Sequence, residues 1–421
     1  MDISLEEAIK KHALPYRSSE DLNRIVDAIG SSKIVLLGEA THGTSEFYTI
    51  RAELSKRLIQ ERGFTIIAVE GDWPPSHAVN RHAKAYTDAE QESREVLQAF
   101  NRWPTWMWAN EEVADFVGWL RLHNDQSAQK TGFYGIDLYS LWESMEEIIR
   151  HLSAADLSGS HLELAKKALA CFEPFSRDPE KYAMSAIHPF NRCIEEVDKL
   201  LSALRQDEAL YKDEWETALS LKINALVARN AEDYYSAMVR DDTLSWNVRD
   251  GHMAEAINEI RDSHGRDAKI IIWEHNTHIG DARATDMHRE GMVNVGQLMR
   301  EQLHAEGVFA VGFGTYMGSV IAARSWGAPF QKMTVPPARL NSWEELLNRT
   351  GAHDKLLLFG EDNHALFNRW VGHRAIGVVY HPEYEARGNY VPSKISQRYD
   401  AFIFINETTA LTPIPIEKPI L

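Results

Sequence analysis

The stretch that decides the fold is KIVLLGEATHGTSEFYTIR, residues 33–51. Its apolar run IVLL predicts a short buried strand that ends at Gly38. Glu39 and His42 follow at once, and both are residue types that do chemistry. Open α/β sheets bind their ligands outside the carboxyl ends of the strands. The sequence therefore predicts a site at His42 to which other strand ends contribute.

Composition limits the classes of protein that the chain can belong to. Its 421 residues include 44% hydrophobic and 25% charged residues, which is ordinary for a folded globular protein. The formal net charge of -17 repels polyanions and so argues against nucleic acid or an anionic membrane as partner. The acidic surface either favours a cationic substrate or only serves solubility.

The two cysteines and the N-terminus predict a cytoplasmic protein. Cys171 and Cys193 show no CxxC or zinc-finger spacing, and we expect them to be reduced core thiols. The N-terminus lacks a basic start followed by an apolar block, and no run approaches the roughly 18 apolar residues of a membrane span. We expect a small-molecule ester as the partner, with no membrane or nucleic acid, and the sequence leaves the oligomeric state open.

Strands and helices alternate around the opening stretch. Residues 45–62 predict an amphipathic helix, and 65–69 (TIIAV) predict the next buried strand, which runs into Glu70 and Asp72. A strand, a helix and a second strand with short links form a βαβ unit, so the two strands should be parallel. Glu39 and Glu70 should then emerge at the same edge of the sheet.

The rest of the chain completes an α/β fold. Further strands are predicted at 132–136, 269–273, 308–313, 319–323, 356–359, 376–380 and 402–405. The glycines of GFGTYMG (312–318) predict a hairpin turn, because the spacing has one residue too many for a dinucleotide fingerprint. Residues 412–421, with three prolines, predict an extended surface arm.

Residues 141–262 lack strand-like runs and show helical periodicity throughout. The predicted fold class is therefore α/β, with a mostly parallel or mixed sheet flanked by helices and an inserted all-helical subdomain. Residues 1–140 and 263–421 would form the catalytic core, and 141–262 the insertion.

Two strand exits carry the residue types of a hydrolytic site. In GEATH, the carboxylate of Glu39 can orient His42 as a base, although a helix cap and a structural hydrogen bond would use the same residues. In HNTH, a helical turn would place His275 and His278 on one face, whereas a loop would leave them as two satisfied polar side chains. Arg51 can hold a substrate oxyanion or neutralise the nearby acids.

Several familiar catalytic motifs are absent from the sequence. It contains no GxSxG nucleophile elbow, no P-loop and no HExxH. Without an obvious serine or cysteine nucleophile, water activated by a base is the simpler hydrolytic mechanism.

Segments along nearly the whole chain resemble the erythromycin esterase family, from about residue 33 to 411. They are GEATHG with Arg51 on the following helix, VEGDWP, FNRWPTWMW, FYGIDLYSL, SWNVRDGHM, EHNTHIGDARATDM, VNVGQLMRE, VGFGTYMG, RAIGVVYHPEYE and DAFIFINETTAL. One short GExxH is a weak signal, but ten such segments in order are specific.

This resemblance implies an erythromycin esterase-like fold and hydrolysis of the lactone ester of 14-membered macrolides by water, without a covalent intermediate. It implies His42 as base, Glu39 as its supporting acid, Arg51 as the family's arginine, and His275 and His278 as its paired downstream histidines. From the convergence of the strand exits, we expect Arg51, His275 and His278 to stabilise the oxyanion or protonate the leaving alkoxide. The mechanism needs no cofactor. If a divalent metal were bound instead, its ligands would be Glu39, His42, His275 and His278.

Other residues are candidates for substrate contact, and other functions stay open. The expected contacts are Glu70, Asp72, Trp103, Trp106, Trp108 and Asn276, although the tryptophans can equally be core. One alternative is hydrolysis of a different ester, lactone or amide. Another is a non-catalytic protein that binds a ligand such as haem in the same cleft through His275 or His278.

Overall fold

The computed structural model describes residues 3–86, 92–154, 159–206, 215–265 and 267–417. Its strands are β1 (Leu14–Pro15), β2 (Ile34–Leu37), β3 (Ile66–Asp72), β4 (Gly132–Asp137), β5 (Ile270–Trp273), β6 (Val308–Ala323), β7 (Phe330–Val335), β8 (Lys355–Leu358), β9 (Trp370–Arg374), β10 (Tyr390–Lys394) and β11 (Ala401–Thr408).

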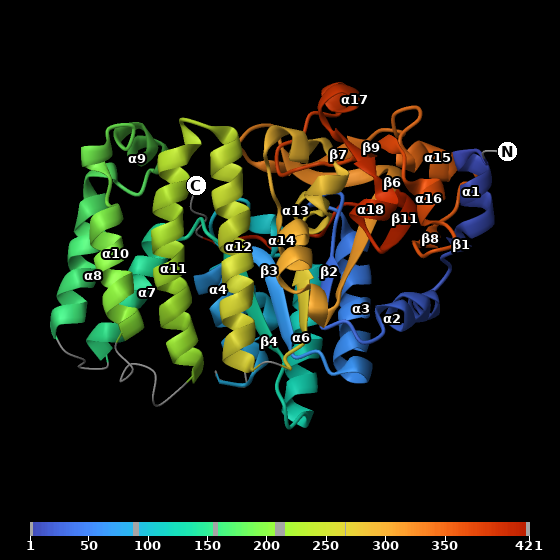
Figure 1. The fold of residues 1–421 in the computed structure, drawn as a ribbon. Coiled ribbons are helices and arrows are strands. Elements are labelled where there is room, and N and C mark those ends of the chain that lie inside the picture. The colour runs from blue at the N-terminus through green and yellow to red at the C-terminus, as the bar shows by residue number, and fades with distance from the viewer. Residues whose placement is uncertain (1–2, 87–91, 155–158, 207–214, 266, 418–421) are drawn as a thin grey trace.

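The helices lie between the strands and in one long run before β5 (Figure 1). They are α1 (Leu5–His12), α2 (Asn23–Ile29), α3 (Ser45–Arg62), α4 (Trp73–Ala83), α5 (Ser93–Val96), α6 (Glu111–Gln126), α7 (Leu141–Ala154), α8 (Gly159–Phe172), α9 (Pro179–Ser185), α10 (Ile194–Gln206), α11 (Trp215–Met238), α12 (Asp242–His264), α13 (Asn276–Ile279), α14 (Val295–Gln302), α15 (Trp343–Arg349), α16 (His364–Phe367), α17 (Glu385–Gly388) and α18 (Ile395–Arg398).

A mixed sheet forms the centre of the molecule, in the order β1-β8-β11-β6-β2-β5-β3-β4, with β7 paired to β6. Neighbouring strands from β11 to β4 are parallel, and β1, β8 and β7 add antiparallel pairs. The predicted parallel arrangement of β2 and β3 is confirmed, and β5 lies between them. The carboxyl ends of β2, β5 and β3 therefore meet at one edge.

Helices cover both faces of this sheet. Residues of β2 alternate between the two apolar cores: Val35 and Leu37 pack with α2, α3 and α6, whereas Ile34 and Leu36 pack with α11, α12 and α14. Every residue of β2 is buried, which is why its sequence is continuously apolar rather than alternating. The predicted α/β class with a helix-flanked sheet is confirmed.

The helical segment before β5 has an apolar cluster of its own, formed by α7 to α11 beside the sheet (Figure 1). However, α11 and α12 also contribute residues such as Leu226 and Ile257 to the core under the sheet. The helix α12 therefore belongs also to the layer that covers the sheet. The predicted boundary at residue 262 stays a prediction.

The expectation of reduced thiols is wrong. Cys171 at the end of α8 and Cys193 before α10 form a disulfide with their Cα atoms 5.9 Å apart. The sequence shows only a separation of 22 residues, whereas the packing of α8 against α10 brings the two side chains together.

The predicted hairpin turn at 312–318 is also wrong, because β6 continues unbroken from Val308 to Ala323. Its glycines admit neighbouring groups: a Cβ at Gly312 would lie 2.6 Å from the Tyr399 ring, and one at Gly314 would lie 2.7 Å from the Phe402 ring. At Gly318, φ is 149°, and the Thr408 carbonyl occupies the place of a Cβ. These glycines mark close packing rather than a turn.

Residues 376–380 do not form the predicted strand. Their backbone bonds to separate partners, since Ile376 donates to the Ala40 carbonyl and Tyr380 donates to that of Ala323. The strand of this region is β9, which pairs with β10. The strands β1, β7, β9 and β10 were not predicted.

The C-terminal segment lies along the core as far as it is described. Ile414 is buried, and its N–H donates to the Ala109 carbonyl. The remainder of the predicted arm, 418–421, lies outside the described residues.

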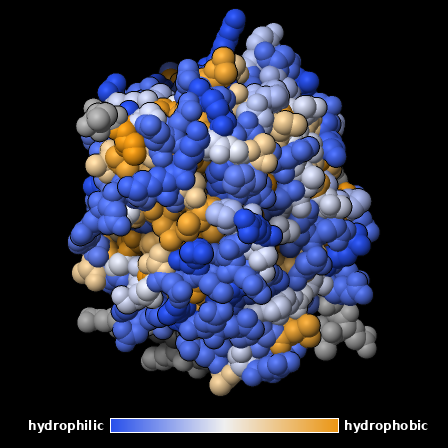
Figure 2. Space-filling model, turned by 90° about the vertical axis from the view of Figure 1, so that its right-hand side faces the viewer, coloured by the Kyte–Doolittle hydropathy of each residue, from blue (hydrophilic) through white to orange (hydrophobic). Residues whose placement is uncertain are grey.

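The face of the molecule at the right of Figure 1, which carries the N-terminal helix α1, is mostly hydrophilic (Figure 2). Among the described helices, none is both long and apolar enough to cross a bilayer.

Candidate active site

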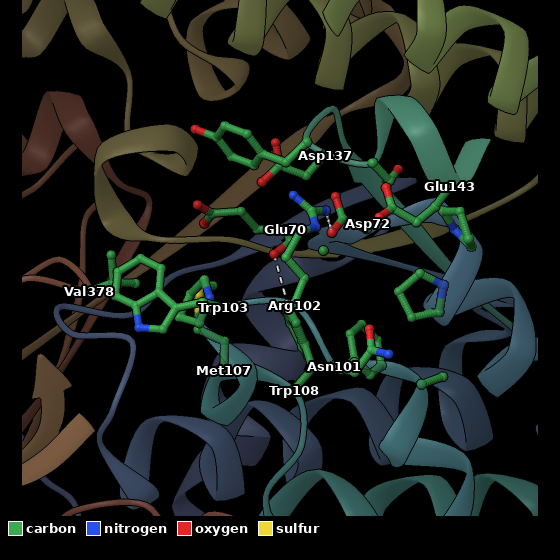
Figure 3. Close-up of a pocket in the computed structure, with 18 of the residues that line it drawn as sticks. Glu70, Asp72, Asn101, Arg102, Trp103, Met107, Trp108, Asp137, Glu143 and Val378 are labelled. Carbon is green, nitrogen blue, oxygen red and sulfur yellow. Dashed lines mark hydrogen bonds and ion pairs between the residues drawn. The ribbon is translucent and has the colours of Figure 1, made fainter. Parts of the chain in front are cut away.

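A cavity of about 400 Å³ opens at the carboxyl edge of the sheet, and His42 lies in its lining. Glu70 and Asp72 reach it from β3, and Asp137 reaches it from β4. Figure 3 shows Trp103, Met107 and Val378 on one side of this cavity and Asp72 and Glu143 on the other. One wall is therefore largely apolar and the other acidic.

His42 is held from behind by a chain of two charged groups. Its Nδ1 lies 2.7 Å from Glu39 Oε1, and the other carboxylate oxygen accepts from Arg51 Nη2 at 2.6 Å. Arg51 is fully buried between the rings of Tyr48 and Trp273. Because Glu39 accepts the Nδ1 proton, the second ring nitrogen, Nε2, is free to act as a base.

The charge around His42 makes it a stronger base than a free imidazole. Burial alone lowers the pKa of His42, but the carboxylates of Glu70 and Glu39 outweigh this effect and raise the pKa above its ordinary value. Of the two predicted uses of Arg51, the geometry supports neutralisation of Glu39 rather than contact with a substrate.

The turn that carries His275 and His278 is bonded directly to the turn that carries His42. Asn276 N–H donates to the Glu39 carbonyl at 2.8 Å, and the Asn276 side chain packs where a Cβ on Gly38 would lie. The rings of His42 and His275 are consequently 4.8 Å apart. The predicted convergence of the two strand exits is therefore present in the structure.

His275 is held by contacts within its own turn. Its Nδ1 caps α13, where it accepts from Thr277 N–H at 3.3 Å and lies 2.8 Å from Thr277 Oγ1. With Nδ1 accepting from the backbone, the proton lies on Nε2, which is buried and outside the lining of the cavity. Burial lowers the pKa of His275 well below its ordinary value, and the neighbouring His42 acts in the same direction. His275 is therefore neutral and carries its proton close to His42.

Two arginines line the cavity: Arg102, which is paired with Asp72, and Arg249 of α12. Arg249 donates from Nε and Nη2 to Asp137, from Nη2 to Glu70 at 2.8 Å, and from Nη1 to His278 Nε2 at 3.2 Å. A guanidinium has five N–H donors, so one Nη1–H is left over from these four bonds. Arg249 can offer that donor to a ligand.

Two of the predicted substrate contacts are core residues instead. Trp106 is fully buried against Trp103, and Asn276 is fully buried with its side chain bonded to the Phe313 backbone. The other predicted contacts, namely Glu70, Asp72, Trp103 and Trp108, do line the cavity.

The four conditional metal ligands do not converge on one point. Glu39 is paired with His42 and Arg51 on one side, while His278 Nδ1 faces Asp250 on the other. Across the part of the chain that the structure describes, no three His, Cys, Asp or Glu side chains are arranged to hold a metal ion.

The sequence interpretation assigned no role to Arg249, Asp137 or Asp250. The segment SWNVRDGHM contributed to the family resemblance. That signal pointed to the segment, but only the packing of α12 against β4 shows which side chains enter the site.

Comparison with known proteins identifies relatives of similar size. The sequence model of the family described as erythromycin esterase matches residues 59–408. A putative hydrolase of Bacillus subtilis is 22% identical over 429 residues, covering 95% of this chain and 90% of the relative. The erythromycin esterase type II of Escherichia coli is 22% identical over 346 residues, covering 75% and 78%.

Solved structures share the fold. A Bacillus cereus protein superposes with a TM-score of 0.80 at 19% identity, covering 98% of each chain. A crystal structure described as a succinoglycan biosynthesis protein gives 0.76 at 19% identity, covering 97% of each. An erythromycin esterase mutant in its open conformation gives 0.69 at 17% identity, covering 96% and 97%.

Proposed function

This chain belongs to the erythromycin esterase family, and on that premise we propose that it opens the lactone ester of macrolides by attack of a water molecule that His42 deprotonates. The names of the family and its relatives indicate a hydrolase. The observation that carries the proposal is the chain Arg51–Glu39–His42, which leaves one imidazole nitrogen free at the cavity. A structural cap would not need a buried arginine behind it.

The first step forms a tetrahedral intermediate. His42 Nε2 takes a proton from water while the water oxygen bonds to the ester carbonyl carbon, and the carbonyl electrons move to its oxygen. The resulting oxyanion is stabilised by the remaining N–H of Arg249, whose other donors hold it in place before the reaction begins.

The second step breaks the ester bond. The protonated His42 returns its proton to the leaving alkoxide as the carbon–oxygen bond cleaves, so that base and acid are the same residue. Glu39 stabilises the imidazolium between the two steps, and Arg51 keeps Glu39 ionised. The product is the ring-opened hydroxy acid, which is heavier than the substrate by one water.

Mass spectrometry of a 14-membered macrolide incubated with the protein tests this reaction. We expect the mass of one added water, and we expect His42→Ala to lose about 100- to 10,000-fold in rate. His123→Ala, at a histidine stacked on Trp119 outside the cavity, is the matched control and should keep full activity. A His42→Ala protein with full activity would exclude His42 as the base.

A panel of substrates separates macrolides from other esters. The cavity of about 400 Å³ with an apolar wall fits part of a large ring better than a small polar ester. We expect 14-membered macrolides to be turned over faster than 16-membered macrolides and small esters. Equal or faster turnover of a small ester or amide would assign that compound class instead.

We propose that the reaction needs no metal cofactor, because the candidate ligand side chains are committed to other partners. Dialysis against EDTA should leave kcat/KM unchanged. A loss that added zinc or manganese restores would assign the reaction to a bound metal.

The haem-binding alternative finds less support in the structure. His275 and His278 are 4% and 3% exposed, and each uses Nδ1 in a hydrogen bond. Neither lines the cavity. Titration with haem should therefore give no Soret shift, and a saturating shift without any ester turnover would favour a binding protein.

A further inference from the structure

His278 is held on two sides by residues of α12. Its Nδ1 lies 3.0 Å from both carboxylate oxygens of Asp250, which is fully buried. The Trp246 ring stacks on the imidazole at 4.7 Å and 6°, and its own Nε1 donates to the Val293 carbonyl. These contacts prevent the ring from turning or tilting.

The hydrogen bonds also determine where His278 carries its proton. Asp250 accepts a second bond, from Val295 N–H at 3.0 Å. Burial raises the pKa of Asp250, while His278 and Arg249 act in the opposite direction. We take the carboxylate as ionised at neutral pH, and an ionised carboxylate can only accept. Nδ1 of His278 must therefore be the donor. On the other side of the ring, Arg249 Nη1 donates to Nε2 at 3.2 Å, so Nε2 carries no proton.

His275, three residues earlier, has the opposite arrangement. Thr277 N–H donates to its Nδ1, so that its proton lies on Nε2. One short turn thus holds two histidines in different tautomers. Nε2 of His275 is buried beside His42, whereas Nε2 of His278 faces Arg249 and, at 3.5 Å, Glu70 Oε1.

We propose that Asp250 is a positioning residue: it fixes His278 as the Nδ1–H tautomer, and His278 in turn orients Arg249 towards the cavity and transfers no proton itself. The catalytic consequence rests on the proposed hydrolase function. The tautomer does not, since it follows from contacts within the resting protein.

The first test is NMR of the protein with ¹⁵N-labelled histidine and no substrate. Long-range ¹H–¹⁵N correlations distinguish the two nitrogens, and His278→Gln assigns the signal. We expect a proton on Nδ1 of His278 in the wild type. In Asp250→Asn the amide can donate to Nδ1, which should move the proton to Nε2. A proton on Nε2 in the wild type would overturn the proposal.

The second test separates positioning from proton transfer. We expect Asp250→Asn to lower kcat by about 10- to 100-fold with little change in KM. His278→Gln can still accept from Arg249 but cannot transfer a proton, so it should keep at least about tenfold more activity than His278→Ala. Equal inactivity of these two His278 variants would make His278 a proton-transfer group and contradict the inference.

A matched control accounts for the loss of a buried acid. Glu232 is fully buried in the helical segment, where Tyr182 and Arg192 donate to it. Glu232→Gln should lower stability without changing kcat or the His278 signals. If the wild type hydrolyses no ester at all, the proposed function fails, while the NMR result still decides the tautomer.

Discussion

The carboxylates of Glu70 and Glu39 raise the basicity of His42, and this gives a prediction for pH dependence. Burial lowers the pKa of His42, but Glu70 and Glu39 together raise it above its ordinary value of 6.5. The base works only when it is unprotonated, so kcat/KM should rise with pH through a pKa above 6.5.

Glu39→Gln removes one of the charges that raise this pKa. The acidic limb of kcat/KM should therefore move to lower pH, while the plateau falls because the imidazolium loses its partner. A pH profile of the two proteins measures both effects. An acidic limb that stays in place while the plateau falls would show that Glu39 does not act through the charge of His42.

Glu274 is a fully buried acid that the proposed mechanism does not use. Neither of its carboxylate oxygens has a hydrogen-bond partner among the described residues. Burial, assisted by the charges of Glu70 and Asp250, raises the pKa of Glu274 well above its ordinary value.

An acid with a raised native pKa binds its proton more tightly in the folded state. The free energy of unfolding therefore falls as pH rises from the unfolded pKa of about 4.3 towards the native pKa. Glu274→Gln has no such proton. In urea melts at pH 5 to 9, the stability difference should move in favour of the variant by about 1.4 kcal/mol per pH unit over that window. Parallel curves would show that Glu274 is ionised in the native state.

At the scale of elements, the disulfide ties α8 to the start of α10. Cys171 and Cys193 are separated by 22 residues, and closing a loop of that length restricts the unfolded chain by about 3 kcal/mol. Replacing both cysteines by serine should lower the free energy of unfolding by about this amount in denaturant melts. Dithiothreitol should destabilise the wild type alone, and kcat should change little because neither cysteine lines the cavity.

Some of the strands could be predicted from the sequence, and others could not. Strands such as β2 and β5 are short, apolar and buried on both faces, so their positions and the polar residues at their ends follow from local pattern. The continuity of β6 does not follow from local pattern. Its glycines at 312 and 314 make room for the aromatic rings of residues 399 and 402, which are distant in the sequence. Single-sequence patterns contain no information about such neighbours.

The residues of the candidate site also differ in how far the sequence predicts them. His42, Glu39 and His275 lie at strand exits, where local sequence already indicates chemistry. Arg249 comes from the middle of a helix, with no strand beside it in sequence, and only the packing of α12 over the sheet aims it into the cavity. The arginine that the sequence offered for an oxyanion contact, or for neutralising the nearby acids, was therefore Arg51, which is nearer in the chain.

At the scale of the whole molecule, the net charge is -17, and part of the excess of acidic residues lies in the acidic wall of the cavity. Glu146 and Glu147 of this wall are paired with Arg177 and Arg150. Glu143 differs, because its Oε2 is buried and has no hydrogen-bond partner among the described residues. Glu143 lies across the cavity from the apolar wall (Figure 3), so under the proposed function it would attract a cationic group such as an amino sugar.

Glu143→Gln tests whether this charge selects the substrate. We expect KM to rise about tenfold for an amine-bearing macrolide and to change little for its neutral N-acetylated analogue. Glu195→Gln makes the same charge change at a residue that is 79% exposed outside the cavity, and it should affect neither compound. For the wild type and the amine, kcat/KM should fall as salt rises to 0.5 M, because ions screen the attraction over roughly 10 Å or less. A salt dependence that survives unchanged in Glu143→Gln would place the attraction in the overall charge of the protein rather than in the cavity.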